Sequence, residues 1–227
     1  MTRFLSPDGR CHTFDQNANG YARGEAIGSL ILKPLKYAMR DRDPIRAIIR
    51  GSGLNQDGRT PGITLPSGIA QEALISHVYK SAGLDPAATE FVEAHGTGTQ
   101  AGDPIETGAL AKVFCQNRDS MQPLRVGSIK TNVGHLEGTS GVAGVIKAIL
   151  MLENGTFLPS RGFTSLNPRI LIDDWKIKVS AQVVENCFLL ITRNIRYNSF
   201  PSPGRQRVLT ASLSIASVTG VAMHTLL

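Results

Sequence analysis

Cysteine is scarce in this 227-residue chain: only Cys11, Cys115 and Cys187 occur, and they show neither metal-ligand nor disulfide spacing. A disulfide-stapled scaffold is therefore not expected, and reduced thiols in the cytosol are the simple interpretation. The two histidines discussed below do not form a zinc site with Cys115, because no second paired ligand lies at metal spacing. No cysteine or serine lies in an obvious nucleophile setting.

Long apolar runs are also missing. Asp8, Gly9 and Arg10 interrupt the N-terminal stretch before an apolar core forms, so no signal peptide is expected. Lys147 breaks the apolar stretch 141–152, and the apolar stretch at the C-terminus is too short to span a bilayer. We therefore expect a soluble, cytoplasmic protein without a membrane partner.

Acidic residues are fewer than basic ones, with 18 Asp and Glu against 24 Lys and Arg and a formal net charge of +6. The basic side chains are spread along the chain rather than clustered, so nucleic-acid binding is not expected. The mildly basic surface would suit an acidic protein partner, and a generic solubilising charge explains it equally well. A hydrophobic content of 41% indicates a globular chain that is able to bury a core.

Strand-like and helix-like segments alternate along the chain. Ser67 is expected to cap a helix that Gly83 ends, and Gly155 is expected to end a later one. The expected buried faces are Ala70, Leu74, Ile75 and Val78 in the first helix, and Val142, Val145, Ile146, Ile149 and Leu152 in the last. The expected strands are 26–34, 45–53, 90–94 and 124–129, and the expected helices are 67–82, 103–115 and 141–153. This alternation predicts an α/β layered domain.

Two glycine-rich segments stand out, 93–99 (Glu-Ala-His-Gly-Thr-Gly-Thr) and 127–137 (Gly-Ser-Ile-Lys-Thr-Asn-Val-Gly-His-Leu-Glu). Each places one histidine, His95 or His135, after a predicted strand. Histidine exchanges protons and donates hydrogen bonds near neutral pH, and glycine allows close approach of a ligand. Lys130 lies five positions before His135, and Glu137 is its expected ion-pair partner. The two loops indicate a constructed site, although a buried structural ion pair and a hydrogen-bonded turn histidine are the plainer alternatives.

Other site types fit less well. Residues 96–101 match the loose dinucleotide pattern G-x-G-x-x-A, but the helix opens later, at Asp103-Pro104. No Gly-Lys dipeptide occurs, which excludes a Walker phosphate loop. Asp103 and Glu106 could form an acid/base pair, but we favour a helix-capping role that would explain both carboxylates.

In these loops the chain resembles a β-ketoacyl synthase, the condensing domain of polyketide and fatty-acid synthases. Residues 93–99 resemble the family's first histidine motif, and residues 130–137 resemble its lysine and second histidine motif. The order of the motifs and the intervening 102–106 strengthen the resemblance. The resemblance spans about residues 5–179 and includes 19–25, 55–58 and 167–168. Within the family, the sequence resembles a fungal, highly reducing, iterative polyketide synthase.

The resemblance implies a thiolase-like α/β fold made of two similar halves. Residues 1–45 would be a remnant of the N-terminal half, 46–180 the C-terminal half, and 181–227 a divergent tail for which disorder is an open alternative. Acids nearly vanish in this tail, where Glu185 is the only one, and 201–204 (Pro-Ser-Pro-Gly) replace the glycines of the closing loop that begins with Tyr197. A truncated, mis-spliced or frameshifted product is the expectation.

The resemblance also implies a mechanism. A cysteine takes an acyl chain from the phosphopantetheine arm of an acyl carrier protein, the histidines assist decarboxylation of a malonyl unit, and the enolate attacks the acyl thioester. His95 and His135 would be the hydrogen-bond donors. Lys130, with Glu137, would hold the network, and Thr97 and Thr99 would contact the pantetheine arm. No cofactor is expected to bind directly.

The family's nucleophile segment, of the type Asp-Thr-Ala-Cys-Ser-Ser, has no counterpart in this chain, which begins after it. We therefore expect the C-terminal part of a ketosynthase that is inactive alone. The alternatives are an assembly fragment that binds a carrier, a complementary half or a second copy, and a weak malonyl decarboxylase. Loss of half of the fold would expose apolar surface and leave marginal stability.

Overall fold

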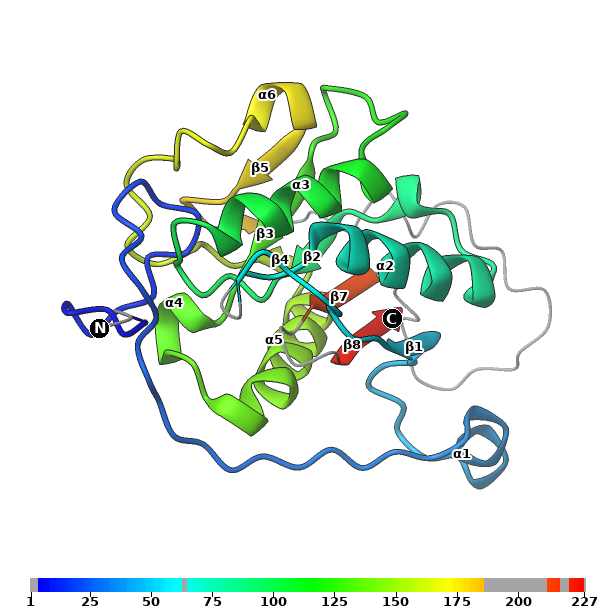
Figure 1. Ribbon diagram of the computed structural model, residues 1–227. Coiled ribbons are helices and arrows are strands. Elements are labelled where there is room, and N and C mark those ends of the chain that lie inside the picture. Colours follow the sequence, from blue (N-terminus) through cyan, green and yellow to red (C-terminus); the bar gives the residue numbers. More distant parts are fainter. Residues whose placement is uncertain (1–3, 63–64, 186–211, 217–220, 227) are drawn as a thin grey trace.

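Three parallel strands form the sheet that carries the two histidine loops. They are β2 (Phe91–Glu93), β3 (Leu124–Gly127) and β5 (Ile177–Val179), in the order β2-β3-β5. Val92 lies opposite Val126, which in turn lies opposite Val179. The computed structural model describes residues 4–62, 65–185, 212–216 and 221–226 (Figure 1).

A second, antiparallel sheet has the order β1-β8-β7, with β1 at Gly51–Leu54, β8 at Val221–Leu226 and β7 at Ser212–Ala216. It adjoins the first sheet where β7 contacts β2. A third, two-stranded pair joins β4 (Thr156–Phe157) to β6 (Val184–Glu185). Strands β7 and β8 lie within residues 181–227, which the sequence predicts to be a divergent tail, so those two segments have regular structure. The strand expected over 45–53 begins only at Gly51, because β8 pairs with residues 51–54 alone.

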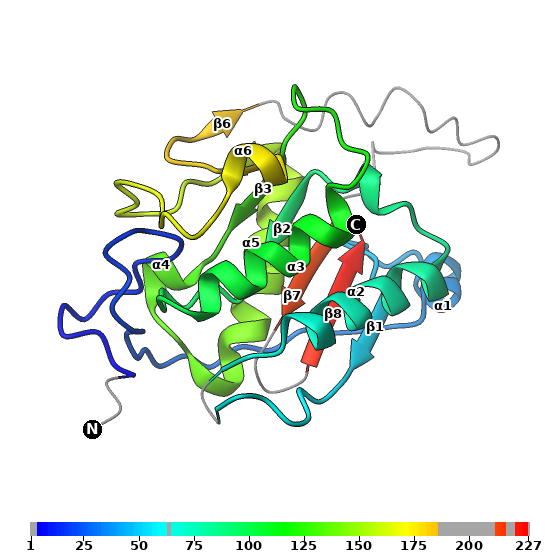
Figure 2. The same cartoon turned by 45° about the horizontal axis from the view of Figure 1, so that its top comes forward.

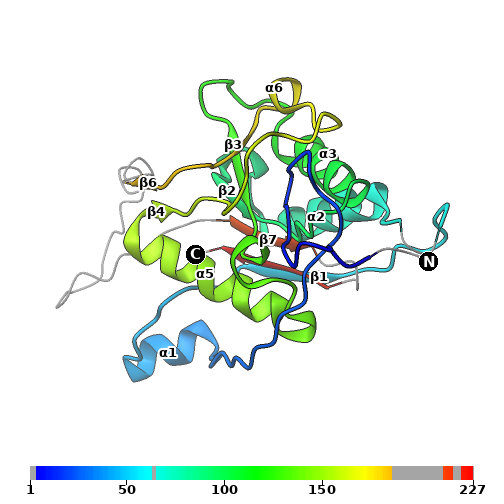
Figure 3. The ribbon, with the colours of Figure 1, turned by 90° about the vertical axis from the view of Figure 1, so that its left-hand side faces the viewer.

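Helices cover both faces of the strands, which confirms the predicted α/β layering. Helices α2 (Gly68–Ala82) and α3 (Gly102–Phe114) lie on one side, and α5 (Ser140–Asn154) lies on the other (Figure 3). Figure 2 shows α2 and α3 running side by side across the strands. The shorter elements are α1 (Leu35–Asp41), α4 (Lys130–Val133), α6 (Ile172–Trp175) and the 3₁₀ turns η1 (Pro86–Ala88) and η2 (Glu137–Thr139). Among the described residues, no helix is both long and apolar enough to cross a bilayer.

The ends of the long helices follow from their local sequence. The Ser67 hydroxyl accepts the Ala70 N–H at 3.1 Å, which satisfies one of the free donors of the first turn of α2. Gly83 and Gly155 adopt φ values of +65° and +61° and end α2 and α5 in the left-handed conformation that glycine tolerates best. The predicted cap and both predicted stops are confirmed.

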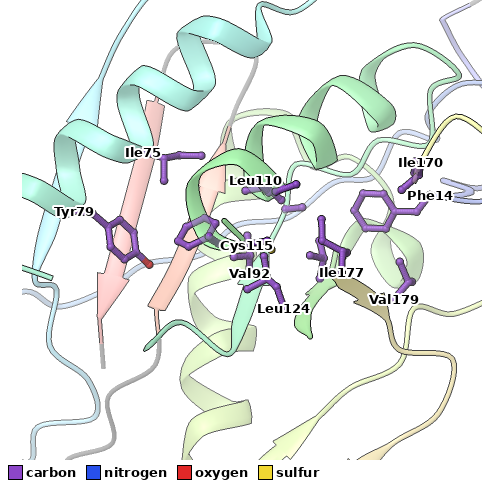
Figure 4. Close-up of a cluster of buried hydrophobic side chains, with 14 residues drawn as sticks. Phe14, Ile75, Tyr79, Val92, Leu110, Cys115, Leu124, Ile170, Ile177 and Val179 are labelled. Atoms are coloured by element: carbon purple, nitrogen blue, oxygen red, sulfur yellow. The ribbon is translucent and has the colours of Figure 1, made fainter. Parts of the chain in front are cut away.

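The main core lies between the sheet and helices α2 and α3. Figure 4 shows Ile75 and Tyr79 from α2 and Leu110 from α3 packed toward Val92 of β2. Neighbouring residues of β2 point to opposite faces, so Phe91 joins a second cluster with Val145, Ala148, Met151, Leu152 and Phe157, next to α5. Both helical layers are therefore fixed to the short strand that leads into the first histidine loop.

The segment 26–34 differs from its prediction as a buried strand. It contains no strand, and Ile27 and Ile31 are fully exposed, with relative exposures of 104% and 100%. It extends past α5 toward α1 (Figure 1), and no strand among the described residues runs beside it. The apolar pattern suits burial, but among these residues only Leu30 is packed against a core cluster.

Candidate active site

The two histidine loops leave the sheet at the same edge. Glu93, the last residue of β2, lies opposite Gly127, the last residue of β3, and the two strands are parallel. The loops that follow therefore converge, as the carboxyl ends of parallel strands do. The rings of His95 and His135 lie with centroids 5.5 Å apart at an interplanar angle of 83°. The structure thus brings together the two histidines that the sequence singled out.

Glu106, from the second turn of α3, holds the first loop by its main chain. Its Oε1 accepts the His95 N–H at 2.6 Å, and its Oε2 accepts the Gly96 N–H at 2.9 Å. The carboxylate is 4% exposed. One buried carboxylate thereby fixes the backbone from which the His95 ring projects.

Asp103 holds the rest of that loop. Its Oδ1 accepts the N–H groups of Gly98 and Thr99 at 3.2 and 3.3 Å, and its Oδ2 accepts the Phe14 N–H at 2.7 Å. The helix begins at Gly102 after Ala101, which makes no side-chain cap hydrogen bond. The prediction that Asp103 and Glu106 cap α3 was therefore wrong. The loop folds over the first turns of α3, and its main-chain N–H groups donate hydrogen bonds to both carboxylates.

Glycine is required where this loop passes closest to its neighbours. Gly98 has a φ of +79°, and a Cβ built on it would lie 2.6 Å from the main-chain nitrogen of His12. Thr99 Oγ1 accepts the Gly102 N–H at 3.1 Å, and Thr97 is buried. The expected contact of Thr97 and Thr99 with a pantetheine arm stays a prediction.

Burial raises the pKa of Glu106 to about 7 and the pKa of Asp103 to about 6. For Glu106 the nearby Asp103 carboxylate acts in the same direction, while the main-chain donors and Lys130 oppose both effects. Carboxyl groups with these pKa values bind more protons in the folded chain than in the unfolded chain between about pH 4 and pH 7. Their contribution to stability therefore falls as pH rises through that window.

A glutamine at position 106 isolates this effect. Glu106→Gln should destabilise the chain at pH 5, because its amide N–H₂ faces a main-chain donor. The destabilisation should shrink by up to about 3 kcal/mol between pH 4.5 and pH 8, since wild type loses the stability of the protonated carboxyl group. Urea unfolding of both proteins across this range measures the difference. If the destabilisation by Glu106→Gln instead grew with pH, Glu106 would be ionised over the whole pH range measured.

Lys130 begins α4 and is 4% exposed. Its Nζ makes no hydrogen bond or ion pair with the described residues, although the charges of Glu106, Glu93, Cys11 and Asp103 act to raise its pKa. Burial outweighs them and lowers the pKa of Lys130 below its ordinary value.

The expected ion pair between Lys130 and Glu137 was wrong. Glu137 Oε1 lies 3.6 Å from Arg23 Nη1, and both side chains are more than half exposed. Glu137 follows the end of α4 with a φ of +50°, at the surface, whereas Lys130 lies inside the loop near the carboxylates of α3. Lys130 and Glu137, seven positions apart in sequence, therefore differ in burial, and Glu137 pairs with Arg23 instead.

Both histidines are held neutral at pH 7. Burial, the Lys130 charge and the neighbouring His135 lower the pKa of His95 well below its ordinary range. Burial and Lys130 also lower the pKa of His135, with Arg23 acting in the same direction and Glu137 opposing it. The Glu137 N–H donates to His135 Nδ1 at 3.0 Å, so this nitrogen is an acceptor and the ring proton lies on Nε2. His135 therefore presents an N–H donor on its other side.

One buried ion pair beneath the loops was not foreseen. Glu93 Oε2 lies 2.7 Å from Lys147 Nζ, and the two side chains are 2% and 5% exposed. Glu93 Oε1 also accepts the Ile129 N–H at 2.5 Å, directly before Lys130. Lys147 interrupts the apolar face of α5, and that interruption was the only available signal. Ile146, expected on the buried face, is 37% exposed instead.

A pocket of about 380 Å³ lies beside Lys130, and Arg10, Cys11, Arg23 and Arg161 are among its lining residues. The Cys11 thiol accepts the Ala22 N–H at 3.2 Å, and burial raises the pKa of both Cys11 and Cys115. Neither thiol is activated as a nucleophile. Cys187 and residues 197–204 lie outside the described residues. No group of three metal-ligating side chains occurs in the described part of the chain.

Two family models match the sequence of this chain. The model of the β-ketoacyl synthase C-terminal domain matches residues 46–164, and the model of its N-terminal domain matches residues 1–38. The chain is 60% identical over 200 residues to the highly reducing polyketide synthase tstA of Talaromyces stipitatus, covering 88% of this chain and 8% of that protein. It is 64% identical over 179 residues to the highly reducing polyketide synthase phiA of a fungal species, covering 79% of this chain and 7% of that protein.

Solved structures give the same result. The ketosynthase from module 6 of the bacillaene synthase of Bacillus subtilis superimposes with a TM-score of 0.83 at 38% identity, covering 99% of this chain and 37% of that one. The predicted thiolase-like layered fold is confirmed. The chain spans less than a tenth of these curated relatives and about a third of the solved ketosynthase.

Proposed function

Because the chain belongs to the β-ketoacyl synthase family, we propose that it serves the decarboxylative Claisen condensation of a malonyl thioester with an acyl thioester. The substrates would be carried on the phosphopantetheine arm of an acyl carrier protein. The observation that supports this is the pair of neutral imidazoles, 5.5 Å apart, at the carboxyl ends of two parallel strands. His95 and His135 are the proposed catalytic residues.

The proposed chemistry begins with loss of carbon dioxide from the malonyl group. The carbon–carbon bond breaks, its electron pair moves into an enolate, and negative charge builds on the thioester oxygen. Two fixed imidazole N–H donors would stabilise that oxygen, which is the largest contribution a site of this kind makes. A neutral imidazole suits the task, because one ring nitrogen donates a hydrogen bond while the other accepts one from the protein and so fixes the ring.

Lys130, Thr97 and Thr99 have supporting roles in this proposal. The buried Lys130 charge opposes protonation of both rings and so keeps them in the neutral, donating form. Thr97 and Thr99 lie in the loop that carries His95, and we place the pantetheine arm along it. In the second step the enolate carbon attacks an acyl thioester on a cysteine, and the cysteine leaves as a thiolate. This chain has no cysteine in the family's nucleophile segment.

The purified chain is therefore expected to form no carbon–carbon bond alone. When it is mixed with a polypeptide that carries the family's cysteine-bearing N-terminal half, malonyl carrier and acyl carrier should give a β-ketoacyl product. Release of carbon dioxide and product formation are measured separately. Steady product formation without the added half would refute the requirement for it. Carbon dioxide release without product would instead support a weak malonyl decarboxylase.

A second candidate, binding of a complementary polypeptide, has its own supporting observation. The exposed segment 26–34 presents Ile27, Ile31 and Leu32 to solvent, and an apolar patch of this kind marks an interaction surface. The N-terminal domain model matches only residues 1–38. We propose that the rest of such a domain covers this segment. Substitution of Ile27 and Ile31 by serine should weaken complementation in the mixing assay, and unchanged complementation would argue against this surface.

A further inference from the structure

The first residue of α5 contacts the second histidine. Ser140 Oγ lies 3.1 Å from His135 Nδ1, and the same oxygen accepts the Leu136 N–H at 2.9 Å. His135 Nδ1 also accepts the Glu137 N–H at 3.0 Å. Two donors therefore converge on one ring nitrogen, one from the main chain and one from a side chain.

The direction of each hydrogen bond follows from the donor inventory. A main-chain N–H can only donate, so Nδ1 must carry a lone pair and no proton. The Ser140 oxygen already accepts from Leu136, which leaves its own proton free to point at Nδ1. If Nδ1 were protonated, it would direct a proton toward the Glu137 N–H at hydrogen-bonding distance, which is unfavourable.

We propose that Ser140 is a positioning residue that keeps His135 in the neutral form with its proton on Nε2, facing the site. This inference rests on the proposed function, because an Nε2–H donor is what enolate stabilisation requires. Without the Ser140 hydroxyl, the Glu137 N–H would be the only donor that keeps His135 Nδ1 free of a proton. A hydroxyl that donates to Nδ1 favours the neutral ring over imidazolium.

The charged groups that act on the titration of His135 are Lys130 at the start of α4, and Arg23 and Glu137 at the surface. The rings of His95 and Tyr21 also face it, at centroid distances of 5.5 Å and 5.2 Å. None of these is altered by substitution at position 140. A change in His135 titration in a Ser140 variant therefore reports the loss of the hydroxyl, acting either directly on Nδ1 or through the Leu136 N–H that it accepts.

The test is nuclear magnetic resonance of chain labelled with ¹⁵N-histidine, with the His135 signals assigned by their loss in His135→Gln. In wild type, the ring nitrogens should show the Nε2–H tautomer. Ser140→Ala should raise the pKa of His135 by roughly half to one unit, the size of one net hydrogen bond. Ser140→Thr keeps the hydroxyl and should behave like wild type.

The control is Ser67→Ala, which removes a hydroxyl from the start of α2 and should leave His135 unchanged. An unchanged His135 pKa in folded Ser140→Ala would overturn the proposal. If that variant fails to fold, an Nδ1–H tautomer in the wild-type spectrum would still overturn the proposal. The measurement uses no substrate, so it can fail or succeed independently of the condensation assay.

Discussion

Replacing His135 by alanine is expected to lower the rate of malonyl decarboxylation in the complemented preparation by roughly 10²- to 10³-fold, the usual effect of removing one oxyanion donor. The loss should fall on kcat rather than on KM, because the hydrogen bond strengthens only as charge develops on the thioester oxygen. Carbon dioxide release under saturating malonyl carrier gives kcat directly.

The matched control is His77→Ala, which removes an exposed imidazole from α2, outside both histidine loops. It should leave the rate within twofold of wild type, by the usual neutrality of exposed positions. His135→Gln offers a finer comparison, since its amide still donates a hydrogen bond but cannot exchange a ring proton. If glutamine were as inactive as alanine, His135 would act by proton transfer rather than as a donor.

His95→Ala should give a loss of similar size, and the double variant should lose little more than either single variant if the two donors act on one oxygen. Fully multiplicative losses would mean that each histidine acts on a different step. The 5.5 Å separation of the two ring centroids favours the first outcome, because rings this close can both reach one substrate oxygen.

Local sequence rules anticipated the regular elements well. The Ser67 cap, the Gly83 and Gly155 stops and the layered alternation are all decided within a few residues, so propensity and periodicity suffice. The prediction of a buried strand over 26–34 was wrong, because strand formation is not decided by the local sequence alone. Its apolar pattern fits a buried strand, yet a strand also needs a neighbour with which to exchange main-chain hydrogen bonds.

In the candidate site, too, some features could be predicted from local sequence and others could not. His95 and His135 could be placed together from sequence because each follows a strand, and the strands proved parallel neighbours. The carboxylates could not be assigned. Asp103 and Glu106 have the spacing of a capping pattern, and only the loop folding over α3 shows which N–H groups they accept. Glu93 and Lys147 lie 54 positions apart, and no local pattern links them.

That buried pair leads to the largest expected change in stability. Lys147→Met should destabilise the chain by about 3–5 kcal/mol, because it leaves the Glu93 carboxylate buried without its counter-charge. Such a loss is a large share of the stability of an ordinary domain. Urea unfolding measured by circular dichroism gives the difference. Lys112→Met is the control, since the pair of Lys112 with Glu72 spans 3.3 Å between side chains that are 63% and 36% exposed, and should contribute at most about 1 kcal/mol.

The double variant Glu93→Gln/Lys147→Met separates charge from packing. Glutamine keeps an oxygen for the Ile129 N–H and carries no charge, so the double variant should regain much of the stability that Lys147→Met loses. Equal destabilisation in both variants would mean that the lysine acts through its packing over the Phe91 ring, 5.4 Å away, and not through the ion pair. Because Ile129 directly precedes Lys130, the double variant should also keep the second histidine loop in place, and its histidine tautomers should match those of wild type.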